Sequence, residues 1–369
     1  MVLHHRVYLT RPAIGNHRAF EFGYLGVWGV NCFFVLSGYL LGRPYLAMLF
    51  DPKRPIPSTR LFYYRRFLRI YPLYAVAILF SLVAVYLTYS TLPSAADIGA
   101  HLLMLHTFNE QFATSLNGPL WTMSVDAEFY ALLPLCAASL SFVLRGQSRE
   151  RRVAVVFGTL ALLFVGAVVF RFVILKEIPQ TVGDFAAAVV YIRNVVGFAG
   201  TFALGLFLAA ISLLYRDRMP RRPVVFTSLV AVGIVIALLQ LVLRMDTSAA
   251  AAASTGRLLR LTFNEALAAI SVSLIFFGLS EARLPFITRL TGTKFVTSAA
   301  ALAYAIYLVH WPIIDGVSAA LHRPQGLGAL ARVGAISIVI VVAVAYVLHR
   351  VVERPILAIK DNLRDVPAR

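Results

Sequence analysis

Charged residues are scarce in this sequence. Only 14% of the 369 residues are Asp, Glu, Lys or Arg and 60% are hydrophobic, whereas a soluble domain has about 25% charged and about 45–50% apolar residues. Acidic residues are the scarcer kind, with 17 Asp and Glu against 34 Lys and Arg, and the chain has only two cysteines. These proportions exclude a soluble globular enzyme, a disordered chain and a disulfide-stabilised scaffold.

The common cofactor and metal motifs are also missing. The sequence contains no Cys/His cluster with metal-ligand spacing, no Walker-type loop and no GxGxxG loop, so we expect no metal and no permanently bound cofactor. The formal charge of +17 could suggest nucleic acid, but the basic residues fall in short clusters between apolar runs. That distribution is typical of membrane orientation, and we expect a lipid bilayer rather than nucleic acid as the partner.

Long apolar runs fill most of the chain, and each approaches the ~20 residues that a helical membrane span needs. Nine such runs are expected to span the membrane: 24–42, 73–92, 127–144, 153–170, 195–215, 224–243, 261–280, 297–318 and 333–348. Helices are expected because a bilayer cannot satisfy the backbone of an open sheet, and barrel strands would alternate polar with apolar residues. The sequence therefore predicts an all-α, polytopic transmembrane bundle.

Lys and Arg predict which loops are cytoplasmic. Most of them lie in one alternate set of loops, at 43–69, 145–152, 216–222, 283–294 and 350–369. Cytoplasmic loops carry the excess of basic residues, so this set and the C-terminus are expected inside. The segment 93–118, with no Lys or Arg, is expected outside.

Two stretches near the N-terminal side combine small or basic residues with aromatics. In FFVLSGY, Ser37 and Gly38 lie within a span, which favours a helix-packing seam of small residues. In YRRFLRIYPLY, Arg66 and Arg69 share a helical face. They either anchor the chain at the cytoplasmic face or bind phosphate groups there, and Pro72 is expected to begin the next span.

Carboxylates and a histidine lie in or beside later spans. In NGPLWTMSVDAEFY, Ser124 could cap a helix with Asp126 or Glu128 near its positive end; alternatively, one carboxylate faces inward and orients a histidine. In YAIYLVHWP, His310 is expected to face the bundle interior.

Two further glutamates, Glu353 and Glu265, are candidates for polar contacts in or beside the spans. Glu353, in VERP, alone indicates an interfacial ion pair and a helix stop. Glu265 is either an inward polar contact or a residue of the outer rim.

The order of these stretches resembles the membrane-bound acyltransferase-3 family. The resemblance rests on FFVLSGY, RRFLRIYPLY, LWTMSVDAEFY, AYAIYLVHWP and VERP, and it extends from residue 2 to about 357. It implies a membrane domain over 1–357 followed by a short cytoplasmic tail over 358–369. It also implies transfer of an acyl group, acetyl in our expectation, from acyl-CoA to a hydroxyl of a carbohydrate, lipid-linked glycan or metabolite. The expected location is the bacterial plasma membrane.

The resemblance also implies roles for individual residues. The family's first helix ends in Val-Leu-aromatic-His, and Val2-Leu3-His4-His5 is similar to that ending, with His5 at the histidine position. The chain would then begin with the remnant of a truncated first helix. We expect His5 to act as catalytic base or transient acyl carrier, oriented by Asp126 or Glu128. The residues expected to bind substrates are Arg66, Arg69, Ser37, Trp121, Tyr130, His310 and Trp311.

Two alternatives remain open from the sequence. A transporter or flippase also has many spans, a basic inner face and intramembrane His and Glu. The basic stretch around Arg66 and the carboxylate–histidine pair argue against it, because transport requires neither. The other alternative is an inactive truncated acyltransferase homologue.

Overall fold

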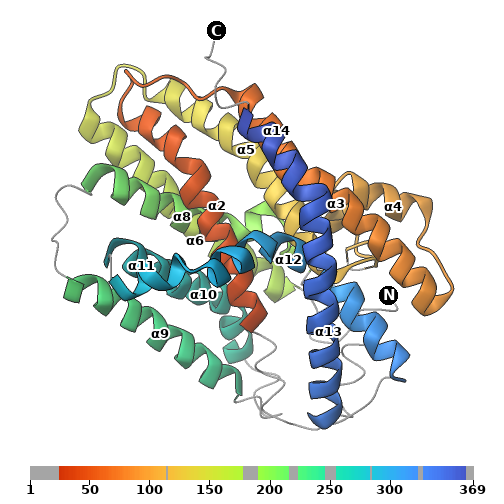
Figure 1. Ribbon diagram of the computed structural model, residues 1–369. Coiled ribbons are helices and arrows are strands. Elements are labelled where there is room, and N and C mark those ends of the chain that lie inside the picture. Colours follow the sequence, from red (N-terminus) through yellow and green to blue (C-terminus); the bar gives the residue numbers. More distant parts are fainter. Residues whose placement is uncertain are drawn as a thin grey trace. The chain divides into compact units, whose positions relative to one another are not determined.

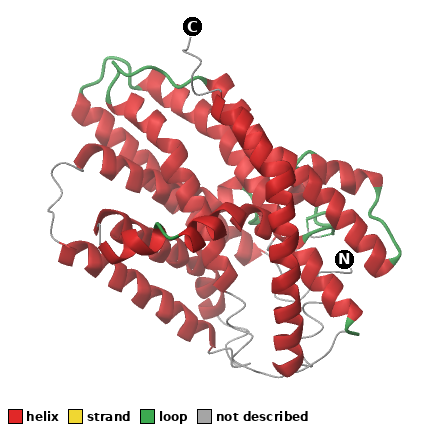
Figure 2. Cartoon of the chain, in the orientation of Figure 1, coloured by secondary structure: helices red, strands yellow, loops and turns green. Residues whose placement is uncertain are grey.

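The computed structural model describes residues 25–113, 115–177, 190–215, 223–245, 255–282, 285–322 and 327–362. Within these ranges every regular element is a helix and no strand occurs (Figure 2). Nine of the described helices are long and apolar enough to cross a membrane. The predicted all-helical bundle with nine spans is confirmed on this part of the chain. The expected remnant of a first helix, residues 1–5, lies outside the described residues.

The chain divides into two compact units, which we call unit 1 and unit 2. Unit 1 comprises 1–16, 58–127 and 290–369, and unit 2 comprises 17–57 and 128–289. The division falls within one helix, α5 (Trp121–Val143), and within the short α11 (Pro285–Thr291).

Unit 2 is a bundle in which α2 packs along α8 and against α10, α6 packs on α8, and α9 packs on α10 (Figure 1). Its helices are α2 (Leu25–Phe50), the larger part of α5, α6 (Arg149–Glu177), α8 (Val195–Tyr215), α9 (Pro223–Met245) and α10 (Thr255–Ala282).

Small residues allow the backbones of α2 and α8 to approach closely. A Cβ at Gly38 would collide with the carbonyl oxygen of Phe202, and one at Gly205 would collide with that of Val35. Beside this contact, the ring of Phe34 lies 4.8 Å from that of Phe202, measured between centroids. The helix-packing seam predicted from Ser37 and Gly38 is therefore present, and at Gly38 it leaves no room for a further group between the helices.

Unit 1 is built around α12, which packs against both α3 and α13. Its elements are α3 (Thr59–Tyr89), α4 (Ala95–Leu102), the short 3₁₀ turns η2 (His106–Phe108) and η3 (Gly118–Leu120), the first turns of α5, α12 (Lys294–Ala320), α13 (Leu327–Leu348), the π-helical turn η5 (His349–Glu353) and α14 (Arg354–Asn362).

Several helices extend beyond their predicted spans, and two specific expectations about helix ends are wrong. Helix α3 begins at Thr59, where the Ser58 hydroxyl accepts the Leu61 N–H at 3.3 Å, so Pro72 lies in its interior instead of beginning a span. Hydropathy detects only the apolar part of a helix, whereas arginines on long aliphatic stems extend it toward water. The helix stop expected at Glu353 is also wrong, because the π-helical turn η5 leads directly into α14.

Candidate active site

The loop before α5 is held in place by buried hydrogen bonds within unit 1. Asn117 is fully buried, and its Nδ2 donates to Ser81 Oγ on α3 at 3.1 Å and to the Leu308 carbonyl on α12 at 2.9 Å. Gly118 follows, and a Cβ there would contact the Trp311 ring at 3.6 Å. The NGPLW stretch is therefore held between α3 and the YLVHWP stretch of α12.

Tyr307 makes a second connection between these two stretches. Its hydroxyl donates to the Pro119 carbonyl at 2.9 Å and lies 2.7 Å from Thr122 Oγ1. His310, one turn further along α12, has its Nδ1 2.7 Å from the Tyr307 carbonyl, so part of its hydrogen-bonding capacity is used by its own helix. These contacts determine where the first turns of α5 lie.

Asp126 follows on α5 and is fully buried in unit 1. The hydroxyl of Tyr304 donates to the Ile70 carbonyl at 2.9 Å, and Asp126 and Arg69 are among the charged groups around it. The guanidinium carbon of Arg69 lies 6.0 Å from the centre of the Tyr304 ring. Tyr304 thus lies near both the carboxylate motif and the arginine motif.

Arg69 is paired with a glutamate from the other end of the chain. Its Nη1 lies 3.0 Å from Oε1 of Glu353, whose side chain is 3% exposed, and Nδ1 of His349 lies 2.8 Å from Oε2. The ion pair expected at Glu353 is confirmed. Arg69 remains partly exposed, with 37% of its side chain accessible, and Arg66, one turn earlier, is half-buried.

Glu128 has a different role from Asp126. It belongs to unit 2, where its Oε2 accepts the backbone N–H of Val195 at 2.8 Å. The Asn194 side chain accepts the Gly197 N–H at 3.0 Å in the same turn. Both side chains satisfy N–H groups that the first turn of α8 would leave without partners. Glu128 therefore acts as a helix cap.

Ser124 is not a helix cap, contrary to one sequence prediction. The turn η3 leads into α5 at Trp121, so Ser124 lies one turn inside the helix. Its Oγ lies 3.3 Å from Nδ1 of His106. The other residues expected at the site divide between the units. Trp121, His310 and Trp311 belong to unit 1, and Ser37 and Tyr130 belong to unit 2.

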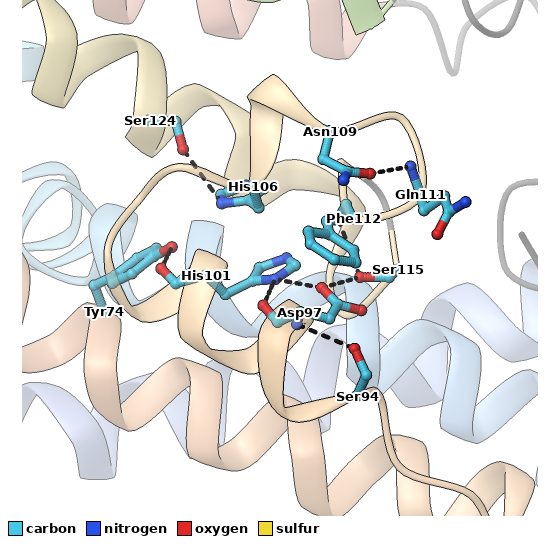
Figure 3. A network of polar contacts seen from close by, with 10 residues as sticks. All are labelled: Tyr74, Ser94, Asp97, His101, His106, Asn109, Gln111, Phe112, Ser115 and Ser124. Atoms are coloured by element: carbon cyan, nitrogen blue, oxygen red, sulfur yellow. Dashed lines mark hydrogen bonds and ion pairs between the residues drawn. The ribbon is translucent and has the colours of Figure 1, made fainter.

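A histidine pair in the segment between α3 and α5 was not anticipated from the sequence. The rings of His101 and His106 are stacked, with centroids 4.0 Å apart and planes inclined by 8°, and both residues are fully buried (Figure 3). Nδ1 of His101 lies 3.0 Å from Oδ1 of Asp97, which also accepts from the Ser115 hydroxyl at 2.8 Å. The Tyr74 hydroxyl donates to the His101 carbonyl at 2.7 Å.

Burial keeps one member of the histidine pair, His106, in its neutral form. Burial lowers the pKa of His106 to about 2, with the neighbouring His101 as the second cause, against a raising effect of the Leu120 backbone. His106 is therefore neutral near pH 7. The network links Asp97 to Ser124, two residues before Asp126. The sequence signal was two histidines five residues apart in a segment without Lys or Arg, and it is too weak to predict stacking.

His5, the proposed base, lies outside the described residues. Within the described ranges, no three His, Cys, Asp or Glu side chains are grouped so that they could hold a metal ion.

Nine long apolar helices in the described part of the chain carry ion pairs and a buried carboxylate, and they define an integral, multi-pass membrane protein with polar sites among its helices. The family model of the acyltransferase-3 family, described as an acyltransferase domain, matches residues 1–350. The chain therefore belongs to this family and is a membrane acyltransferase. Comparison with curated proteins found no match, and comparison with solved structures found none either.

Proposed function

We propose that this protein is an integral membrane O-acyltransferase that moves an acetyl group from acetyl-CoA to a hydroxyl of a carbohydrate or another envelope or secreted acceptor. The observation that carries the proposal is Asp126. It is a fully buried carboxylate at the position where the resemblance places the glutamate of the family's Ser-Val-Glu, and the hydrogen bonds of Asn117 and Tyr307 hold the segment that leads into its helix.

The chemistry requires a base and a bound thioester. The acceptor oxygen forms a bond to the acyl carbon, the bond from that carbon to sulfur breaks, the base takes the hydroxyl proton, and coenzyme A leaves as its thiol after gaining a proton. A histidine suits the base because its pKa of ~6.5 permits proton exchange near neutral pH. We assign this role to His5, and a carboxylate beside it would orient the ring and stabilise the imidazolium.

Of the two carboxylates, we assign the orienting role to Asp126. Glu128 already accepts the first N–H of α8, and moving it away would leave that donor without its partner. Asp126 belongs to the unit that also contains Arg69, the proposed donor-binding arginine.

Arg66 and Arg69 would bind the phosphates of coenzyme A, because guanidinium groups match phosphate oxygens in charge and geometry. The salt bridge to Glu353 uses Nη1 of Arg69, so its other N–H groups can still donate. His310 and Trp311 would line the acceptor side.

Mass spectrometry of envelope glycans and secreted metabolites tests the proposal. A strain lacking the gene should lose acetyl groups from one class of acceptor, and the intact gene should restore them. If the acceptor keeps its acetyl groups but accumulates on one side of the membrane, the protein is a transporter. If acetylation and distribution both stay unchanged, the inactive-homologue alternative holds.

Substitution of the two N-terminal histidines tests the assignment of the base. His5→Ala should abolish transfer at unchanged expression, whereas His4→Ala should be mild, because the resemblance places His5 and not His4 at the family's histidine position. Loss of transfer in the His4 variant alone would show that His4 is the base.

A further inference from the structure

Two arginines on helix α6 are almost completely buried, and they differ in how their N–H groups are satisfied. Arg152 is 6% exposed, and all three of its nitrogens donate to backbone carbonyls, of Gln147 at 3.1 Å, Leu49 at 3.0 Å and Leu144 at 2.7 Å. Arg152 therefore ties α6 to its neighbours at one end of unit 2. Arg171, at the other end of the helix, is 7% exposed.

Among the described residues, the guanidinium of Arg171 has an ion-pair contact and an aromatic contact but no hydrogen bond. Its Nη2 lies 3.8 Å from Oε2 of Glu265, which is longer than a hydrogen bond, and its Cζ lies 5.5 Å from the centre of the Phe198 ring. Nε and Nη1 are buried, and neither has a hydrogen-bond partner in the part of the chain that the structure describes. Two donors of a buried cation are thus available.

The carboxylate that faces Arg171 belongs to a polar cluster on four helices. Asn31 of α2 donates through Nδ2 to Oε1 of Glu265 on α10. The Thr201 hydroxyl on α8 donates to Oδ1 of Asn31 at 3.3 Å. All four residues, Arg171 included, are buried, with 9% or less of each residue exposed. Of the two alternatives for Glu265, the inward polar contact is therefore correct.

The four residues lie near the same end of unit 2. Asn31 and Thr201 are in the first third of α2 and α8, Glu265 is in the first half of α10, and Arg171 is in the last third of α6. The distribution of basic loops predicts that this end faces outward. The cluster is therefore on the side where an acceptor outside the cytoplasm would arrive.

A purely structural cluster would satisfy its buried donors, as Arg152 does, because an unpaired polar group in an apolar interior is costly. Buried polar groups that a fold leaves unsatisfied are instead available to a ligand. The charges of Arg171 and Glu265 cancel, so a bound anion would leave an uncompensated negative charge among apolar helices. A neutral hydroxyl avoids that charge, and it can accept from Arg171 and donate to Glu265.

We propose that Arg171, Glu265, Asn31 and Thr201 form a binding site for a hydroxyl-rich ligand. If the protein is the acyltransferase proposed above, this ligand is the acceptor and the site is its recognition subsite. The site itself does not depend on that reaction.

Binding is measured on the full chain, purified in a detergent without a sugar headgroup. The probes are the methyl glycosides of glucose, galactose and mannose, with inorganic phosphate and acetate as anionic probes, and the readout is the thermal unfolding midpoint. At least one glycoside should raise the midpoint of the wild type, and neither anion should. Arg171→Met should lose the shift, whereas Arg149→Met, an exposed arginine on the same helix, should keep it.

If Arg171→Met does not fold, Glu265→Gln replaces it, since its amide still accepts from Asn31 but no longer offers a carboxylate to a hydroxyl. This variant should bind the glycoside at least severalfold more weakly. The proposal is overturned if no glycoside shifts the wild type, if phosphate or acetate does so instead, or if the folded variants respond as the wild type does.

Kinetics then separate this site from the proposed reaction. Arg171→Met should raise the KM for the acceptor roughly tenfold, as expected for loss of a charged hydrogen bond, with the KM for acyl-CoA unchanged. Glycoside binding without any acyl transfer would refute the proposed function and leave the site standing. Acyl transfer with an unchanged acceptor KM in the variant would refute the assignment of the acceptor to this site and leave the proposed function standing.

Discussion

Arg69 and Glu353 are 284 residues apart in sequence and form a salt bridge of 3.0 Å between Nη1 and Oε1. The other carboxylate oxygen of Glu353 is 2.8 Å from Nδ1 of His349. The glutamate lies in the only π-helical turn of the described residues, and such turns are often found at functional sites. The RRFLRIYP and VERP stretches therefore act together, with Glu353 holding Arg69 in one orientation.

Glu353→Gln should weaken acyl-CoA binding several-fold and change kcat much less, because Arg69 remains but loses the carboxylate charge that orients it.

Arg69→Ala should raise the KM for acyl-CoA roughly tenfold, since a phosphate contact by a charged donor contributes ~1.5–3 kcal/mol. Glu150→Gln, at an exposed position of α6, is the control. Wild-type binding of coenzyme A in both variants would assign the salt bridge a purely structural role.

Gly38→Ala should destabilise the protein by about 1–3 kcal/mol, because the added Cβ collides with the Phe202 carbonyl, a backbone atom that cannot rotate away. Gly158→Ala is the matched control on α6, where a Cβ meets nothing within 4 Å. That change should stabilise the helix by about 0.5–1 kcal/mol. Thermal unfolding in detergent measures both, and equal midpoints for the two variants would show that the α2–α8 seam tolerates a methyl group.

The stability of the protein should fall as the pH drops below ~6.5. The unfolded chain protonates His106 near its ordinary pKa of 6.5, whereas the folded chain does so only at about 2. Between these values the unfolded state binds more protons, so this residue lowers the free energy of unfolding by up to about 1.4 kcal/mol per pH unit. Above ~6.5 it has no effect on pH dependence.

His106→Gln should flatten the pH dependence of the unfolding midpoint between about pH 4 and pH 6.5. His322→Asn, at an exposed histidine after α12 with positive φ, should leave the wild-type slope in place, since asparagine tolerates that conformation. A wild-type slope in the His106 variant would mean that other groups cause the acid sensitivity.

The predicted orientation is tested by cysteine labelling of intact cells. A cysteine replacing Ser94, before α4, should react with a membrane-impermeant reagent, and one replacing Ser58, before α3, should react only after lysis. Both positions are exposed helix caps. The reverse pattern would place Arg69 on the side without coenzyme A and would refute the proposed donor site.

The spans could be predicted from the sequence because bilayer thickness requires a minimum apolar length, which hydropathy measures directly. The ends of the helices could not be predicted in this way. Helix α3 begins before the charged residues Arg65 and Arg66, and hydropathy gives no sign of a helix there. The tight α2–α8 seam was anticipated from Gly38 because a small residue in mid-span has few other uses.

The partners of the polar residues could not be predicted in the same way. Arg171 and Glu265 are neighbours only because α6 and α10 pack together, and no local pattern encodes that contact. The same holds for the stacking of His101 on His106. The roles of Asp126 and Glu128 were left open because both fit a carboxylate near a helix start. Only the Val195 contact of Glu128 separates them.

The central claim is that Asp126 serves the acyl-transfer step. The most direct measurement is the rate of transfer from radiolabelled acetyl-CoA to acceptor by Asp126→Asn and Glu128→Gln, with expression and unfolding midpoint measured alongside. Asp126→Asn should lose roughly 10²–10⁴ in rate, while Glu128→Gln, which can still accept the Val195 N–H, should stay within a few-fold of the wild type. Full activity in Asp126→Asn, with loss in Glu128→Gln at normal stability, would contradict the account.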